Sequence, residues 1–570
     1  MYAGKAELVK VPKEKVHILK NGYVYWYDTS KWDNTLKRTV DNRKSIGKLD
    51  PDHPGMMFPN QTYFTLFAGS AQAASDAGVL KEDGSTKLPV PGKFAAVLNF
   101  GPFLALLCAA KNIGTLEILK KFFPRLYREI LALAIHSIDE QSSVGQEFPY
   151  WAFHNYCGLS KPLSSGEISR VYEEIAEDPE DVRNFMYYHK ELYHSVIHDA
   201  SETVLAFDST NQSTSSSGIP LAEYGHPKDK SKKKLPDINT ALFVDESTGI
   251  PLYYEHFCGS ILDKSQTPFT VERAKDLGFK KLFLMMDRGY FSQQVIDSLS
   301  DMKFGLMCPD SLTLVKDVIT AYADSVKDNE DHYIPEENVY GIHLADQNVC
   351  NGSYDVYLFY DPMRAEDERD AIHGKIKRLL GIVQERKRFS ERLVELYSPW
   401  LIIKKIRRSK GAVRNFTVEE NKPAIQECLN EAGFFVILSN AHLDAGNMIR
   451  VARMRDRGEK AFRRIKTQFG LSETYMHEAT TYEGKMFVAF IALIIVETYR
   501  WYIRNELSAI SSTTTATTLG ELRKFQIQLK PDRTWMPVYA PTKKQKKIFA
   551  ALNISNQEIE DMVRAVRLRV

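Results

Sequence analysis

Two apolar segments of the sequence each end in an aspartate. "TVLAFD" ends at Asp208 and "KKLFLMMD" ends at Asp287. Both runs have the length and composition of buried strands, and open α/β sheets place their ligands at the carboxyl ends of neighbouring strands. Two carboxylates held there could bind hard divalent cations through oxygen. Paired cations of this kind activate a hydroxyl group and stabilise the leaving oxygen in phosphoryl transfer.

A third acid, Glu459, lies within the basic segment "RMRDRGEKAFRRIK", which runs from Arg453 to Lys466. A segment that only held a polyanion would gain from being wholly basic. Glu459 therefore either pairs with neighbouring cations or binds a metal ion. At about 100° per residue, Arg455, Glu459 and Lys466 fall within roughly 40° of one another on a helix. That stripe combines a carboxylate for a metal ion with cations that can hold phosphates.

Each acid also has an ordinary structural interpretation. An aspartate at a strand end is usually a turn residue or a helix cap, and Glu459 alone could pair with nearby arginines such as Arg463. The order of the three acids along the chain favours catalysis. We assign Asp245 and Glu246 to a hairpin turn, and Asp263 to capping the helix that follows it.

The segments around these acids alternate between strand and helix patterns. A strand precedes Asp208, a hairpin covers "TALFVDESTGIPLYYEHF", and a helix separates it from the strand before Asp287. Ser292 is expected to cap the next helix. "GFFVILSN" is predicted to be another core strand, and "MFVAFIALIIVETYRWY" a buried helix. This order is typical of a mixed-sheet α/β core.

The composition excludes several classes of protein. The 570 residues include 75 Lys and Arg against 73 Asp and Glu, so any positive face must be local. Six widely spaced cysteines argue against a zinc knuckle or a disulfide framework and suit a reducing, cytoplasmic location. No signal peptide is expected, and the longest apolar run, Met486 to Val496, is too short to span a bilayer. The absence of a GxxxxGK[ST] motif predicts no nucleotide cofactor.

Arg455-x3-Glu459-x6-Lys466 resembles the Arg, Glu and Lys of the Tyr-Arg-Glu-Lys signature of insertion-sequence DDE transposases. "DSTN" and "DRGYFS" resemble the first and second aspartate motifs of that family, and "GFFVILSN" resembles the strand before the signature helix. The resemblance covers roughly residues 200 to 500. One position departs from the pattern, because this chain has Ala452 where the signature has tyrosine.

The resemblance implies an RNase H-like mixed-sheet α/β core interrupted by a partly β-stranded insertion. We therefore expect six regions along the chain. These are a small β-rich basic element (1–60), a helical DNA-binding region (61–200), the first part of the catalytic core (201–311), an insertion (312–432), the second part of the core with the glutamate helix (433–510), and a linker with a basic helical tail (511–570).

The resemblance also implies an activity, cofactors and partners. The expected activity is nicking of transposon ends at inverted repeats, followed by joining of the 3′-hydroxyl to target DNA. Asp208, Asp287 and Glu459 would hold two Mg²⁺ or Mn²⁺ ions. The expected partners are double-stranded DNA and a second copy of the chain in a synaptic dimer, without a membrane. The alternatives are an RNase H-like nuclease without strand transfer and a non-catalytic DNA-binding derivative.

Further basic and aromatic residues are candidates for DNA contact. Arg455, Arg463 and Lys466 are assigned to phosphate binding. In the loop "KDKSKKK" the choice lies between a solvated surface and DNA-backbone contact, and the candidate residues there are Lys230, Lys232 and Lys233. Trp400 could stack on a flipped base in a hairpin intermediate, as some members of the family require. The simpler interpretation is that Trp400 anchors the long helix of the insertion.

Overall fold

The computed structural model describes the chain in two compact units, one within Met1–Ala95 and the other within Ala96–Leu568. The residues outside the description are 1–7, 14, 34–37, 67–94, 198–202, 226–234, 246, 277, 279–281, 386–390, 410–411, 455–462, 464–471, 507–513 and 567–570. Each unit is considered separately below.

The smaller unit is an antiparallel five-stranded sheet with one short helix. Its strand order is β1-β5-β4-β3-β2. The elements are β1 (Val9–Lys10), β2 (Val16–Ile18), β3 (Tyr23–Asp33), β4 (Arg38–Leu49), β5 (Met56–Pro59) and α1 (Gln61–Leu66). Val24, Ile46 and Met57 form its buried core.

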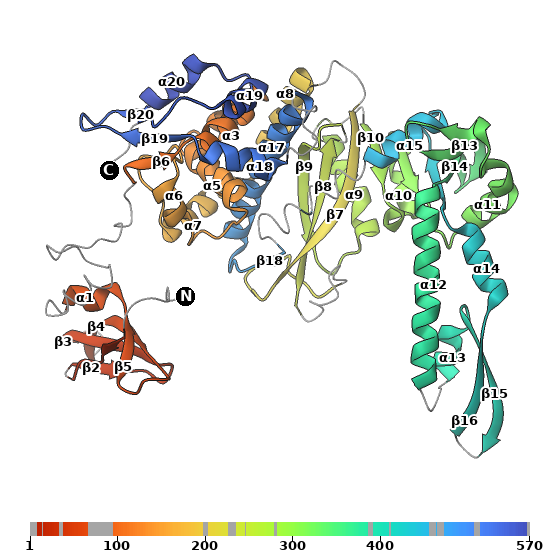
Figure 1. The fold of residues 1–570 in the computed structure, drawn as a ribbon, viewed down its shortest axis with the longest axis horizontal. Helices are drawn as coiled ribbons and strands as arrows, with labels where there is room; N and C mark the ends of the chain where they lie inside the picture. Colours follow the sequence, from red (N-terminus) through yellow and green to blue (C-terminus); the bar gives the residue numbers. More distant parts are fainter. Residues whose placement is uncertain are drawn as a thin grey trace. The chain divides into compact units, whose positions relative to one another are not determined.

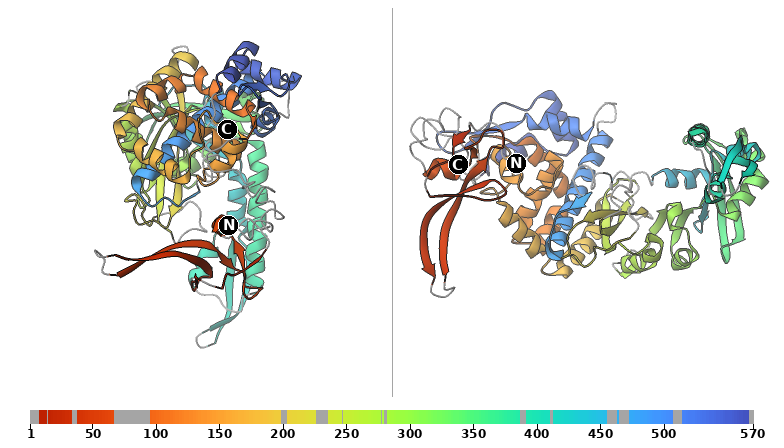
Figure 2. Two further views of the ribbon diagram at one scale, coloured as in Figure 1. Left: turned by 90° about the vertical axis from the view of Figure 1, so that its left-hand side faces the viewer. Right: turned by 90° about the horizontal axis from the view of Figure 1, so that it is seen from below.

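The larger unit begins with helices that pack around one long apolar helix, α17 (Ala479–Glu506) (Figures 1 and 2). The helices of this region are α3 (Gly101–Asn112), α4 (Thr115–Phe122), α5 (Tyr127–Glu140), α6 (Phe148–His154), α7 (Ser165–Ile175) and α8 (Pro179–Ile197). Of these, α3, α5 and α7 contact α17 most extensively. Among the described residues α17 is long and apolar enough to cross a membrane, and 83% of its most apolar window is buried inside the protein. The apolar character of α17 on all sides is therefore accounted for by its central position.

The C-terminal segment returns to this helical region. It comprises α18 (Thr515–Arg523), β19 (Gln526–Leu529), β20 (Trp535–Pro537), α19 (Lys543–Ala551) and α20 (Asn556–Arg564). β19 pairs with β6 (Val97–Asn99), so the two ends of the unit share a small sheet. The expectation of a linker over 511–518 is wrong from Thr514 onward, because Thr514 and Thr517 form a capping box that begins α18.

A mixed ten-stranded sheet forms the centre of the larger unit. Its core strands lie in the order β9-β8-β7-β10-β11, with β7, β8 and β9 antiparallel and β10 and β11 parallel to β7. The bounds are β7 (Thr203–Thr214), β8 (Asp237–Asp245), β9 (Pro251–Cys258), β10 (Leu282–Met286) and β11 (Lys303–Met307). Helices α9 (Asp263–Asp276) and α10 (Gln293–Ser298) connect these strands. This arrangement confirms the predicted mixed α/β, RNase H-like fold class.

The segment expected to be an insertion contributes strands to the same sheet. β17 (Phe434–Ser439) pairs with β11 on one side and with β14 (Gly352–Tyr360) on the other. β13 (Val339–Val349) and β12 (Tyr333–Ile334) follow β14 and complete that side of the sheet. After β17 the chain enters α15 (Ala445–Met454).

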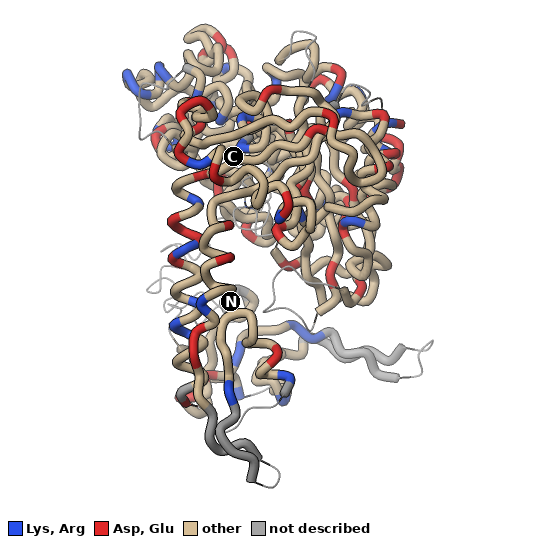
Figure 3. The backbone as a smooth tube through the Cα atoms, turned by 90° about the vertical axis from the view of Figure 1, so that its right-hand side faces the viewer, with Lys and Arg blue, Asp and Glu red and all other residues tan. Residues whose placement is uncertain are grey.

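Beyond the sheet, the same segment forms a helix and hairpin extension (Figure 1). Its elements are α12 (Pro362–Glu385), α13 (Glu391–Tyr397), β15 (Leu401–Ser409), β16 (Ala412–Glu420) and α14 (Lys422–Glu431). The helix α11 (Thr313–Val326) instead packs against β13, β14 and β17 of the sheet. Acidic and basic residues both occur along α12, with acids mainly in its first half and bases mainly in its second (Figure 3). Such mixed charge is typical of a solvated helix rather than of a face that binds one polyanion.

Candidate active site

The parallel pairing of β7 and β10 brings the two predicted aspartates together. Met285 of β10 lies opposite Ala206 of β7. The same register, continued by two residues, places Asp287 beside Asp208. Because neighbouring strands lie about 4.8 Å apart, the two residues are neighbours across the sheet, at the point where β10 ends and β7 continues. Asp287 follows the end of β10, as the strand-end argument predicted. The prediction that a strand ends at Asp208 is wrong, because the polar residues after it continue β7 to Thr214 by pairing with β8.

Both aspartates also point toward one face of the sheet. Met285 belongs to a buried cluster that includes Met448 of α15. Side chains alternate along an extended chain, and Asp287, two residues after Met285, has extended backbone angles. Ala206 lies opposite Met285, and Asp208 comes two residues after Ala206 in β7. Its side chain therefore points to the same face as that of Asp287. The two carboxylates therefore lie on the face covered by α15, the helix that leads into the segment containing Glu459.

Local hydrogen bonds orient each carboxylate. Oδ1 of Asp208 accepts a hydrogen bond from the backbone N–H of Ser209 at 2.7 Å, and Oδ1 of Asp287 accepts one from the N–H of Arg288 at 2.7 Å. Both aspartates are partly buried. A donor set of two oriented carboxylates fits a hard divalent cation such as Mg²⁺ or Mn²⁺.

Tyr290 is a residue of this site that the sequence argument did not identify. Its hydroxyl lies 3.1 Å from Asp208 Oδ1 and 2.7 Å from Ser209 Oγ. Burial, followed by the negative charges of Asp208 and Asp263, raises the pKa of Tyr290 well above its usual range. The phenol is therefore neutral, and its hydroxyl can donate a hydrogen bond to Asp208. The signal in the sequence is the position of Tyr290 within "DRGYFS", three residues after Asp287.

The neighbouring acids have structural roles. Oδ1 of Asp245 accepts hydrogen bonds from Ser247 Oγ at 2.5 Å and from the Thr248 N–H at 2.8 Å, as expected for a residue of the hairpin turn. Glu246 lies outside the described residues. Asp263 was expected to precede and cap a helix, but it is itself the first residue of α9.

The third predicted acid, Glu459, falls outside the described part of the chain. So do the candidate DNA-binding residues Arg455 and Lys466 of the same segment, and Lys230, Lys232 and Lys233 of the loop between β7 and β8. Arg463 is helical and exposed. Ala452, at the position of the signature tyrosine, is 8% exposed and packs in the apolar cluster beneath α15.

Arg453, the first residue of the basic segment, has structural partners. Its guanidinium Nη2 lies 2.9 Å from Asp361 Oδ2, and its Nη1 lies 3.2 Å from Glu337 Oε2 and also donates to the Glu337 carbonyl. Both partners belong to the segment between β11 and β17. Arg453 thus ties the C-terminal end of α15 to that segment, so at least one cation of the basic run serves the fold.

Trp400 lies between α13 and β15, where Lys375 Nζ of α12 is 4.1 Å from the centre of its ring. Its backbone N–H donates to the Tyr397 carbonyl, and its own carbonyl accepts from Asn421. These contacts fit the interpretation that Trp400 anchors the long helix. The base-stacking role remains a prediction.

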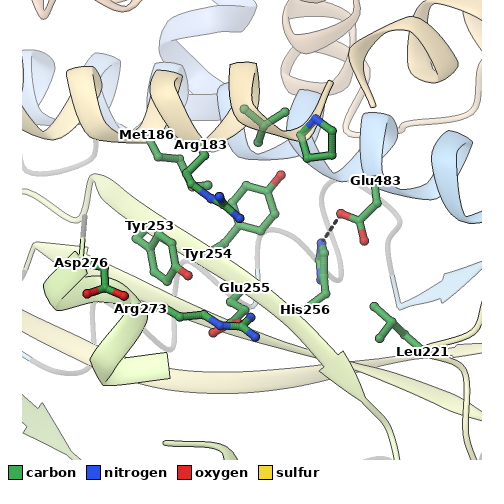
Figure 4. Close-up of a pocket in the computed structure, with 12 residues that line it drawn as sticks. Arg183, Met186, Leu221, Tyr253, Tyr254, Glu255, His256, Arg273, Asp276 and Glu483 are labelled. Carbon is green, nitrogen blue, oxygen red and sulfur yellow. Dashed lines mark hydrogen bonds and ion pairs between the residues drawn. The ribbon is translucent and has the colours of Figure 1, made fainter. Parts of the chain in front are cut away.

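A cavity of about 480 Å³ lies at the outer edge strand β9 (Figure 4). His256 Nε2 points toward Glu483 Oε2 at 3.7 Å, and burial lowers the pKa of His256 although the charge of Glu483 acts in the opposite direction. The register places Asp208 opposite Leu242, and Leu242 opposite Tyr254 of the cavity. Two strand spacings, roughly 10 Å, therefore separate the cavity from the aspartates.

Comparison with known proteins identifies a family for this chain. Residues 199–495, more than half of the chain, match the model described as "Transposase DDE domain". The chain therefore belongs to the transposase DDE domain family. No curated protein matches it. A cryo-EM structure of a piggyBac transposase synaptic complex with hairpin DNA aligns with this chain at 9% sequence identity and a TM-score of 0.35. The alignment covers 82% of this chain and 83% of the piggyBac chain.

Proposed function

We propose that this protein is a DDE transposase that nicks transposon ends at inverted repeats and joins the freed 3′-hydroxyl to target DNA. The observation that carries the proposal is the parallel pairing of β7 and β10, in which Met285 lies opposite Ala206. Continuing this register by two residues brings Asp287 beside Asp208, on the side of the sheet where Met285 packs with α15. Membership of the transposase DDE domain family supports it. The Glu459 segment follows α15 directly in the chain.

The residues take separate roles in this proposal. Asp208, Asp287 and Glu459 would hold two Mg²⁺ or Mn²⁺ ions, which when bound activate the attacking hydroxyl and stabilise the leaving oxygen. Hydrogen bonds from Ser209, Arg288 and Tyr290 hold the two aspartates in orientation. Preorganised ligands of this kind lower the cost of reaching the transition state.

DNA contacts and assembly form the second part of the proposal. Arg455, Arg463 and Lys466 would bind phosphates beside the cut, as the Tyr-Arg-Glu-Lys signature implies, with Lys230, Lys232 and Lys233 as further backbone contacts. Joining two transposon ends requires a synaptic dimer. Because Ala452 replaces the signature tyrosine, phosphate binding at the cut would depend on these basic residues.

The test is cleavage and joining of labelled DNA carrying the element's own ends in Mg²⁺, for the wild type and Glu459→Gln. The substitution removes the charge and nearly preserves the shape. We expect the variant to bind DNA and to lose nicking and joining by at least about 1,000-fold, because a ligand to the reacting centre is removed.

The matched control is Glu560→Gln on α20, where the glutamate is exposed and pairs with Arg564. It should cut and join like the wild type. If Glu459→Gln retains cutting, Glu459 belongs to its arginine neighbours and the assigned site is wrong. If the wild type cuts without joining, the protein is a nuclease of the same fold. If it only binds DNA, it is a non-catalytic derivative.

A further inference from the structure

A second group of metal-ligating side chains lies in the part of the sheet formed by β13, β14 and β17. Asp355 of β14 is completely buried, and Asp346 of β13 and His442 are exposed. Their ligand atoms all lie within 4.8 Å of one another. His343 of β13 adds another imidazole, with Nε2 3.2 Å from Asp355 Oδ2. We call these four residues the β14 cluster.

The β14 cluster is distinct from the candidate active site. Asp355 pairs with Ser439 of β17, and Ser439 pairs with Gly305 of β11. Gly305 in turn lies opposite Met285 of β10, two residues before Asp287. Three strand spacings, roughly 14 Å, therefore separate Asp355 from the strand that carries Asp287.

Several groups converge on one oxygen of Asp355. Oδ2 lies 3.0 Å from His442 Nδ1, 3.2 Å from His343 Nε2 and 3.3 Å from the Tyr357 hydroxyl. Oδ1 accepts the backbone N–H of Asp346 at 3.2 Å. Within the described chain, no lysine or arginine forms an ion pair with Asp355. A buried carboxylate is costly unless a positive charge or several hydrogen bonds compensate it.

We propose that the β14 cluster binds a divalent transition metal ion of the zinc class, with Asp346, Asp355 and His442 as ligands. Mixed imidazole and carboxylate ligands favour such ions, whereas the aspartates of the active site offer oxygen ligands suited to Mg²⁺. Zinc bonds of about 2.0–2.2 Å hold ligand atoms roughly 3.4 Å apart in a tetrahedral site. Shifts of about 1 Å by the two exposed side chains would close the site around the ion.

The position of the ligands defines what the ion would do. Asp346 lies in a bulge of β13, Asp355 lies in β14, and His442 lies three residues before α15 begins. One ion would therefore tie two strands to the start of α15. His343 would not bind the ion itself. It would orient the ligand Asp355 through a hydrogen bond, as residues next to the ligands do in other metal sites.

The test measures metal binding and does not depend on transposase activity. Co²⁺, whose visible absorption reports its ligands, is titrated into the full-length protein with Mg²⁺ in large excess to occupy the oxygen-rich site. We expect one Co²⁺ per chain with an imidazole-type spectrum, and affinity at least tenfold weaker in His442→Gln. Zn²⁺ should raise the melting temperature of the wild type by about 2 °C or more, and not that of the variant.

Two controls separate the possible sources of binding. His373→Gln on α12 removes an exposed histidine away from the cluster, and Asp208→Asn alters the active site. Both should bind Co²⁺ like the wild type, whereas Asp346→Asn should weaken binding as His442→Gln does. Equal affinity and spectra in the wild type, His442→Gln and Asp346→Asn would overturn the proposal. The cluster would then be a hydrogen-bond network around a buried aspartate.

Discussion

At the scale of single residues, Tyr290 shows how a site is held by a group that does not itself react. The Tyr290→Phe variant removes one hydroxyl from between Asp208 and Ser209. We expect it to fold, to lose about 1 kcal/mol of stability, and to nick DNA roughly tenfold more slowly because Asp208 is less well oriented. Urea unfolding and single-turnover nicking measure the two effects. Tyr322→Phe, on an exposed face of α11, should change neither.

The position of Asp287 could be predicted from the sequence because it follows an apolar strand, and the end of an apolar run is a local feature. The apolar run before Asp208 also ends there, but β7 continues through polar residues that pair with β8, which the local pattern does not reveal. Ser292 was also predicted from a local pattern, and its side chain does accept the Val295 N–H at 3.3 Å. Tyr290 could not be predicted, because its contact with Asp208 depends on how β7 and β10 pair across 82 residues of sequence. The ion pairs of Arg453 also join residues far apart in the sequence. The basic segment around Arg453 therefore gives no sign that this arginine has a structural role.

At the scale of elements, the packing of α17 against α7 depends on one glycine. A methyl group at Gly484 would overlap the backbone carbonyl of Tyr172 in α7. Backbone cannot yield as a flexible side chain can, so we expect Gly484→Ala to destabilise the protein by about 1–3 kcal/mol. Gly520→Ala in α18 has open space around it and should stabilise by about 0.5–1 kcal/mol. The measurement is the denaturant midpoint of each variant. If the midpoints of Gly484→Ala and Gly520→Ala shift in the same direction from that of the wild type, the prediction is wrong.

Elements were predicted best where a local pattern determines them. The strands β7, β8, β9, β10 and β17 follow apolar or alternating runs, and α17 follows an apolar run too long for a strand. The start of α18 was missed because threonine-rich sequence hides a capping box. The joining of β14 to β17 was missed because residues such as Tyr357 and Ile437 pair across a long intervening segment.

At the scale of the whole molecule, two buried histidines make stability depend on pH. Burial lowers the pKa of His136 and of His189 to about 4 each, from an ordinary value near 6.5. Between those values the unfolded chain binds more protons than the folded one, so stability falls as the pH is lowered from about 6.5 to 4. Each histidine contributes at most about 3 kcal/mol to this loss.

Urea unfolding at several pH values between 7 and 4 checks the effect. His136 packs against Phe148 and Trp151, so His136→Phe keeps an aromatic ring in an apolar site. The variant should lose the contribution of one of the two histidines, so the dependence on pH should become about half as steep. Replacing the exposed His373 with glutamine should leave it unchanged. A wild-type slope retained in His136→Phe would show that other groups cause the acid sensitivity.

β17 pairs with β11 along one edge and with β14 along the other, and all six of its residues are buried. The segment between β11 and β17 is therefore not an independent module that could be deleted or transferred to another protein. Its removal would uncover one edge of β17, a mostly apolar strand with unpaired backbone groups, and chains aggregate through such edges. Shortened relatives of this protein would therefore need either a replacement for β14 or a different β17.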